Sequence, residues 1–118
     1  MVASACSSSN LATVDSAGGV RLFISITVGA DGLPVVSYHD NTNLDLKVAH
    51  CNDAACASAA LTTVDSAGNI GYFTSITIGA DGWPIICYYD NSYWSNTRAD
   101  LQVARCSSAS CMPYVWRR

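Results

Sequence analysis

The sequence predicts an all-β fold made from two copies of one structural unit, on the basis of three observations. First, residues 11–41 and 61–91 align at an offset of 50, and 19 positions are identical. Second, the 118 residues include one lysine and no glutamate, although both are common on helix surfaces. Third, β-branched residues with Asp, Asn, Ser and Gly replace them, which is typical of strands and tight turns. We therefore expect a repeat architecture, in which one unit needs another to bury its apolar face.

In the first unit, short alternating or β-branched segments predict four strands. Residues 11–15 form a first strand, and residues 22–28 form a second, in which apolar side chains alternate with Phe23, Ser25 and Thr27. Glycines at positions 29 and 32 allow a tight reversal into a strand over residues 34–38. A polar turn then leads into a strand over residues 45–51.

The second unit repeats this order, with strands expected over residues 61–65, 72–78, 84–89 and 100–106. Four strands in about 50 residues is the pattern of a β-propeller blade. We therefore expect an all-β fold of β-propeller type, with two tandem four-stranded antiparallel blades. Residues 61–65 are the outer strand of the first blade, so residues 11–15 have no blade before them and the second blade lacks its outer strand.

This shift by one strand determines the expected organisation. Residues 1–10 are a lead-in, residues 11–111 are a two-blade module with repeats over about 11–56 and 61–111, and residues 112–118 are a tail. Closed propellers need about four to eight blades, so we expect completion by oligomerisation or a place in a larger propeller. In a head-to-tail homo-oligomer, residues 11–15 of one copy complete the last blade of another and close a ring. A trimer, with six blades, is favoured.

Charge and hydropathy exclude several partners. The net charge of −3 gives no reason to expect nucleic acid or an anionic membrane surface. No apolar run approaches the roughly 18–20 residues that span a bilayer. We therefore expect no nucleic-acid partner and no membrane partner.

The cysteines belong to the repeat. Cys51 with Cys56, and Cys106 with Cys111, form two C-x4-C motifs. This spacing favours a disulfide in each motif over reduced thiols or a metal, because zinc ribbons use C-x2-C and no histidine cluster completes a site. Disulfides imply an oxidising, extracellular location. Cys87 stands where the first copy has Ser37, and we expect it to be free and buried.

The segments SITVGADGLPVVSYHD and SITIGADGWPIICYYD, followed by DLKVAHC and DLQVARC, resemble blade repeats of secreted bacterial β-propeller proteins, both sialidase-like and lectin-like. The resemblance covers residues 11–111 and implies the propeller fold. The sialidase Asp-box turn is not met, because Gly68 comes one position late after Asp65. Short two-blade lectins that assemble into rings are similar in plan, but their sugar-binding motifs are not recognisable in this chain.

The sequence does not indicate an enzyme or a cofactor. The arginines, His39 and His50 are not at repeated positions, and the spacing shows no Ser-His-Asp arrangement. Nothing selects a glycosidase pair among the nine aspartates. The repeated aspartates fall at strand ends and turns, where Asp caps turns through its side chain; calcium at the loops after Asp40 and Asp90 is the alternative. We expect no metal site.

Departures from the repeat give the candidate binding residues. The second copy has five extra residues in the turn after Asn91, and Trp83 replaces Leu33. Aromatic rings beside amide and guanidinium groups suit stacking on sugars with polar contacts at the rim. The candidate ligand-binding residues are Trp83, Tyr93, Trp94, Asn96 and Arg98. The alternative is that Trp94 covers a blade edge or an oligomer contact.

These observations predict a non-catalytic extracellular binding module for a carbohydrate or protein ligand. One alternative is a fragment of a secreted glycan-processing propeller enzyme. Another is a purely structural repeat module.

Overall fold

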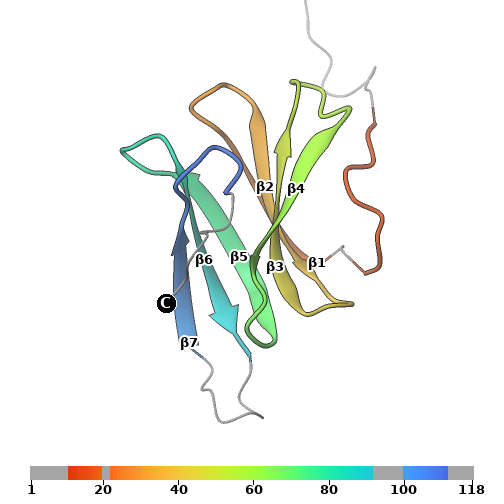
Figure 1. Cartoon of the computed structure of the whole chain (residues 1–118), viewed down its shortest axis with the longest axis vertical. Coiled ribbons are helices and arrows are strands. Elements are labelled where there is room, and N and C mark those ends of the chain that lie inside the picture. Colours follow the sequence, from red (N-terminus) through yellow and green to blue (C-terminus); the bar gives the residue numbers. More distant parts are fainter. Residues whose placement is uncertain (1–10, 20–21, 92–99, 112–118) are drawn as a thin grey trace, which may run out of the picture.

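The computed structural model describes residues 11–19, 22–91 and 100–111, and every regular element in these residues is a strand (Figure 1). Strands β1 (Leu22–Val28), β2 (Pro34–Asp40), β3 (Asp45–Cys51) and β4 (Ala59–Asp65) form one sheet in that order. Strands β5 (Ile70–Ile78), β6 (Pro84–Asp90) and β7 (Asp100–Arg105) form a second sheet. All paired strands are antiparallel, so the predicted all-β architecture is confirmed.

Most of the expected strands are present, with ends within two residues of the prediction. Strands β1 and β3 have the predicted bounds, β2, β4, β5 and β6 are longer, and β7 stops one residue earlier. Residues 11–15 have no regular structure in the single chain, so the strand that we expect to pair with another copy stays a prediction. A strand needs a partner for its backbone groups, and none of the described strands pairs with this segment.

The repeat builds the same turn twice, between β1 and β2 and between β5 and β6. The Gly29 N–H donates to the Leu33 carbonyl at 2.8 Å, and the Gly79 N–H donates to the Trp83 carbonyl at 2.8 Å. Gly32 and Gly82 close these turns with φ values of +82° and +87°, in a region that favours glycine. The expected tight reversals are therefore confirmed.

The core lies between the two sheets, because β5 packs across β1, β2 and β3 of the first sheet (Figure 1). The buried side chains on the facing sides include Leu46 and Val48 from β3 and Ile76 and Ile86 from the second sheet. The Phe23 and Phe73 rings also meet across this interface, with centroids 4.4 Å apart. Phe23 and Phe73 share a φ of +53° at irregularities in β1 and β5, so the expected even alternation of β1 is broken at Phe23.

The segment over residues 11–19 lies along the first sheet, on the side away from the second sheet (Figure 1). Its main anchor is Asp15, whose Oδ2 accepts hydrogen bonds from the Tyr38 hydroxyl at 2.7 Å and from the Lys47 ammonium at 3.0 Å. Further along, the Thr42 hydroxyl accepts from the Gly19 N–H at 2.8 Å. The described residues therefore form three layers: the second sheet, the first sheet and this segment.

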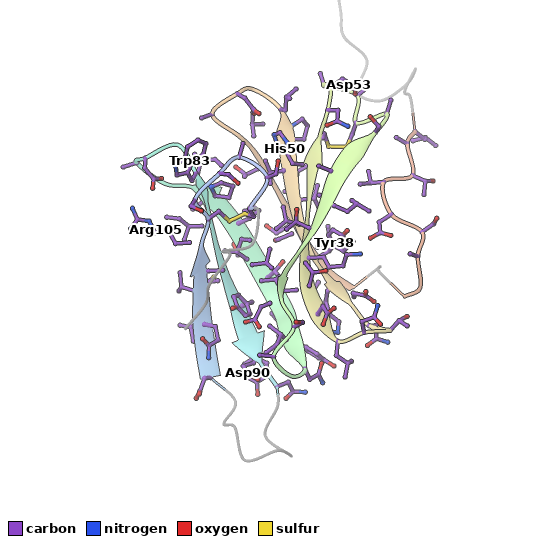
Figure 2. The ribbon with its side chains drawn as sticks, in the orientation of Figure 1. Tyr38, His50, Asp53, Trp83, Asp90 and Arg105 are labelled. Carbon is purple, nitrogen blue, oxygen red and sulfur yellow. A yellow bond between two sulfur atoms is a disulfide. The ribbon has the colours of Figure 1, made fainter. Side chains whose placement is uncertain are left out.

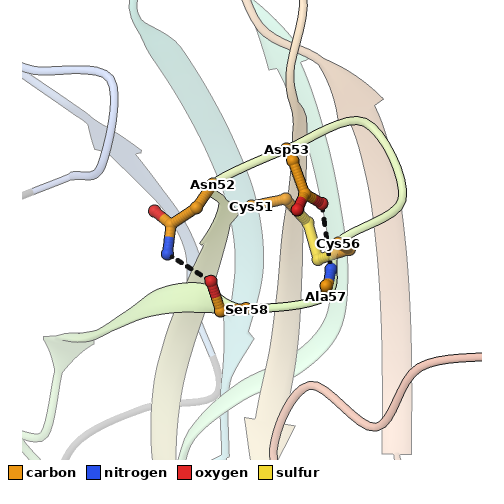
Figure 3. Close-up of a disulfide and its surroundings, with 6 residues drawn as sticks. All are labelled: Cys51, Asn52, Asp53, Cys56, Ala57 and Ser58. Atoms are coloured by element: carbon orange, nitrogen blue, oxygen red, sulfur yellow. Dashed lines mark hydrogen bonds between the residues drawn. A yellow bond between two sulfur atoms is a disulfide. The ribbon is translucent and has the colours of Figure 1, made fainter.

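Both predicted disulfides are present, Cys51–Cys56 and Cys106–Cys111. The first closes the β3–β4 connection, where Asn52 Nδ2 donates to Ser58 Oγ and the Ala57 N–H donates to Asp53 (Figure 3). Two disulfides are consistent with an extracellular protein. Cys87 is free, as expected, but it is half-buried rather than buried, because no other described sheet packs on its side of the second sheet.

The described residues contain no helix that is long and apolar enough to cross a membrane. They also contain no cluster of three or more histidine, cysteine or acidic side chains placed to hold a metal ion.

Candidate functional site

Of the predicted binding residues, Trp83 alone lies in the described part of the chain. Tyr93, Trp94, Asn96 and Arg98 lie outside the described residues, so their contribution stays a prediction. Trp83 precedes β6, whereas Asp90 is its last residue, and the two side chains lie at opposite ends of that strand (Figure 2). A strand of this length spans roughly 20 Å. The candidate site is therefore the end of the sheets where Trp83 lies.

At this end, the two repeated turns approach each other and enclose a cavity. A Cβ atom on Gly82 would lie 3.4 Å from the Ala30 side chain, so the turns are in close contact. The cavity has a volume of about 290 Å³. Its lining comes from both turns and from the second disulfide loop: Gly29, Ala30, Asp31, Ile78, Gly82, Trp83, Pro84 and Ala109. Trp83 is 38% exposed and offers part of its indole surface there.

Asp31 provides the charge in the cavity lining. Its Oδ1 accepts a hydrogen bond from the Leu33 N–H at 3.0 Å, and its Oδ2 lies 2.8 Å from His50 Nε2. The Leu33 N–H and then the His50 ring lower the pKa of Asp31 below its ordinary value. Its side chain remains 37% exposed, so an ionised carboxylate with accessible surface belongs to the same cavity lining as Trp83.

His50 also connects to the second disulfide loop, because its Nδ1 lies 3.3 Å from Ser110 Oγ. The structure thus brings Ser110, His50 and Asp31 together, an arrangement that their spacing in the sequence did not indicate. The second copy has an equivalent contact in which an arginine replaces the histidine, since Arg105 donates to Asp81 at 3.1 Å. The sequence signal was the departure from the repeat: His50 aligns with Arg105, and Ser110 aligns with Ala55.

A second group of aromatic rings gathers where β1, β2 and β5 meet. His39 is fully buried, its Nδ1 lies 2.7 Å from the Ile70 carbonyl, and its ring centroid is 4.6 Å from that of Tyr72. Within the described residues, His39 Nε2 has no hydrogen-bond partner. Phe23 and Phe73, which occupy equivalent positions in the two copies, also contact each other through their rings. The rings of this cluster mainly pack the two sheets against each other.

Comparison with models of protein families, with curated proteins and with solved structures finds no match to this chain.

Proposed function

We propose that this chain is a non-catalytic, extracellular binding module of β-propeller type whose ligand is a carbohydrate. The observation that carries the proposal is the cavity at the turns, whose lining includes both Trp83 and the ionised Asp31. An aromatic face packs against the C–H groups of a sugar ring, and a carboxylate accepts hydrogen bonds from its hydroxyls.

The size of the cavity favours a small ligand. Pockets that bind small molecules occupy roughly 300–1,000 Å³, and this cavity lies at the lower limit of that range. It therefore suits one sugar unit, such as the terminal residue of a glycan. The polar atoms are few and their positions are fixed by the turns, as expected for a pre-formed site.

The propeller-type arrangement is supported by the way the two sheets pack. Each sheet contains the three equivalent strands of one repeat, and the first sheet also contains β4 from the start of the second repeat. The sheets meet face to face with β1 and β5, the first strand of each sheet, in contact. Propeller blades pack in this manner around a common axis. The two disulfides support the extracellular location.

The repeat offers a matched substitution for the test. Trp83→Leu places at this position the residue that the first copy has there, Leu33, so the turn should be preserved. On a glycan array, we expect this variant to lose at least about tenfold in affinity, with the melting temperature nearly unchanged. Trp94→Ala tests, in the same assay, the predicted contribution of the longer turn after Asn91. Glycan binding that survives Trp83→Leu unchanged contradicts the proposal.

A second candidate function, ester hydrolysis, is favoured by one observation. If His50 carries its proton on Nε2 and donates it in a hydrogen bond to Asp31, its Nδ1 is unprotonated and can accept the proton of the Ser110 hydroxyl. This is the hydrogen-bond order of an activated serine. Against it, the equivalent contact in the second copy is the ion pair of Arg105 and Asp81, and an arginine stays protonated and cannot accept a proton from a serine.

The repeat again supplies a matched variant. Ser110→Ala introduces the residue of the first copy, Ala55, and leaves the His50–Asp31 contact in place. Hydrolysis of p-nitrophenyl acetate that disappears in this variant would establish the second candidate. A rate that is the same for both proteins excludes it.

A further inference from the structure

We propose that copies of this chain assemble head to tail through the outer faces of their two sheets. In this assembly, the outer face of the second sheet of one copy packs on the outer face of the first sheet of the next copy. Residues 11–15 of that next copy then add to the edge of β7 that no other described strand pairs with. The partner is a second copy of this chain, and this inference does not depend on the carbohydrate proposal.

The first observation concerns the residues on the two outer faces. In the repeat, these residues are equivalent to the residues that form the two sides of the interface between the sheets. Leu46 and Val48 are completely buried between the sheets, whereas their equivalents in β7, Leu101 and Val103, are 78% and 61% exposed. On the opposing side, Ile76 is 7% exposed, whereas its equivalent Ile26 is 64% exposed. Each exposed face therefore matches the surface that already covers its counterpart within the chain.

The second observation is a cavity in the outer face of the first sheet. It has a volume of about 290 Å³ and is lined by Ala12, Thr13, Val14, Asp15, Ile24, Val36, Tyr38 and Ala49. In the second sheet, the equivalents of several of these residues belong to the core cluster that Leu46 and Val48 fill: Val64, Ile86, Tyr88 and Ala104. The side chains of Leu101 and Val103 from another copy are the equivalent filling.

The third observation is the position of residues 11–15. Asp65, at the end of β4, accepts a hydrogen bond at 2.6 Å from the hydroxyl of Tyr88 in the other sheet. Asp15 accepts the equivalent bond from Tyr38 at 2.7 Å. Residues 11–15 therefore already lie against the first sheet as the end of β4 lies against the second. β4 pairs with β3. The repeat equivalent of β3 is β7, and among the described strands β7 has no such partner on its outer edge.

The β3–β4 pairing gives the register of this contact. In β3 and β4, Val48 lies opposite Thr62 and Ala49 lies opposite Leu61. By equivalence, Val103 lies opposite Ala12 of the next copy, and Ala104 lies opposite Leu11 of the next copy. Adding this strand satisfies the backbone groups at the edge of β7 and gives the second sheet the same four strands as the first.

The fourth observation is a paired substitution at the interface. Within the chain, the hydroxyls of Ser37 and Thr74 lie 2.7 Å apart, and Thr74 donates to the Phe23 carbonyl at 3.0 Å. Their equivalents on the outer faces are Cys87 and Ile24. Both members of a buried polar pair have thus changed to weakly polar or apolar side chains, which leaves no hydroxyl without a partner. The half-buried state of Cys87 is explained by the missing copy.

The contact joins two different faces, so it repeats in every copy until the assembly closes. At two sheets per chain, two, three or four chains supply four, six or eight sheets, all within the range of closed propellers. Of these, we expect a trimer.

Native mass spectrometry and sedimentation at micromolar concentration test the assembly. We expect one species at three times the mass of the chain, and Val103→Asp should convert it to a folded monomer. Val103 is exposed in the single chain, so circular dichroism should be unchanged by this substitution. The matched control is Ala54→Asp on the exposed first disulfide loop, which should leave the trimer intact. A wild-type monomer, or a trimer that survives Val103→Asp, overturns the proposal.

Engineered disulfides test the register. With Cys6 and Cys87 replaced by alanine, Ala12→Cys combined with Val103→Cys should cross-link neighbouring copies on oxidation. Leu11→Cys combined with Val103→Cys should not, because a shift of one residue places the two side chains on opposite faces of the sheet. Cross-linking of the second pair alone, or of neither pair in an intact trimer, contradicts the addition of residues 11–15 to β7 in this register.

Discussion

At the scale of single residues, aspartates fix the ends of the strands. Asp15, Asp31, Asp65 and Asp81 each accept a hydrogen bond at 3.0 Å from the backbone N–H two residues later. Asp40 does the same with Thr42 at 2.9 Å. The expectation that the repeated aspartates cap turns is therefore confirmed at these positions. Their remaining oxygens reach across to side chains such as Tyr38, His50, Tyr88 and Arg105.

Asp15 provides a prediction for pH dependence. Burial raises the pKa of Asp15, but hydrogen bonds from Ala17, Tyr38 and Lys47 together lower that pKa below its ordinary value of 3.8. A lowered folded-state pKa stabilises the fold above the unfolded-state pKa, and this contribution is lost as pH falls through the folded-state pKa. Asp15→Asn should therefore cost about 1 kcal/mol near pH 7 and much less below pH 3, in urea unfolding followed by fluorescence. An equal loss at both pH values contradicts the assignment.

At the scale of elements, the packing of the two sheets depends on a close approach between β5 and β3. Gly71, near the start of β5, has a φ of +94°, and a Cβ atom there would lie 3.0 Å from Leu46 Cα and 3.3 Å from the Asp45 carbonyl oxygen. These neighbours are backbone atoms or are fixed to the backbone, so they cannot move aside. The glycine therefore permits the contact that buries Leu46.

This approach predicts that Gly71→Ala is strongly destabilising. We expect a loss of roughly 2–4 kcal/mol, because backbone strain adds to a steric clash with β3. Gly32→Ala is the control, since Gly32 also has a positive φ but its added Cβ would have open space around it. The control should cost about 1 kcal/mol, the strain alone. Chemical unfolding measures both values, and equal losses would show that the contact with β3 is unimportant.

At the scale of the whole molecule, the two sheets are joined by an interface that the chain can repeat with another copy. The internal interface contains the hydroxyl pair of Ser37 and Thr74, and the outer faces have Cys87 and Ile24 in its place. This difference disfavours pairing an inner face with an outer face, because a hydroxyl that packs opposite an apolar side chain has no hydrogen-bond partner.

The paired difference predicts the outcome of a double-mutant cycle on the assembly. Cys87→Ser alone and Ile24→Thr alone should each weaken trimer formation by about tenfold, because each buries a hydroxyl that lacks its natural partner. The double variant should regain most of that affinity, since the two new hydroxyls can bond as Ser37 and Thr74 do. Sedimentation equilibrium gives the three constants. Additive losses in the double variant would show that these positions do not meet between copies.

Local patterns in the sequence predicted most of the fold. The offset of 50 and the alternation of apolar residues predicted seven of the observed strands, and the C-x4-C spacing predicted both disulfides. Trp83 was found because it departs from the repeat at Leu33. The Ser110–His50–Asp31 contact was missed, because its members come from three turns or strand ends that are brought together only when the sheets pack.

The sequence by itself determined the strands, their turns and their disulfides, because hydrogen-bonding within a hairpin and the geometry of a tight turn depend on residues close together in the chain. Only the tertiary structure decided which face of each sheet is covered. Ile26 and Ile76 occupy equivalent positions with the same side chain, yet one is exposed and the other is buried. Burial depends on the sheet that lies opposite, and a single chain supplies that sheet for one of the two residues. Residues 11–15 repeat the sequence of a strand but have no regular structure for the same reason. Pairing requires a neighbouring strand edge, which their own chain does not place beside them.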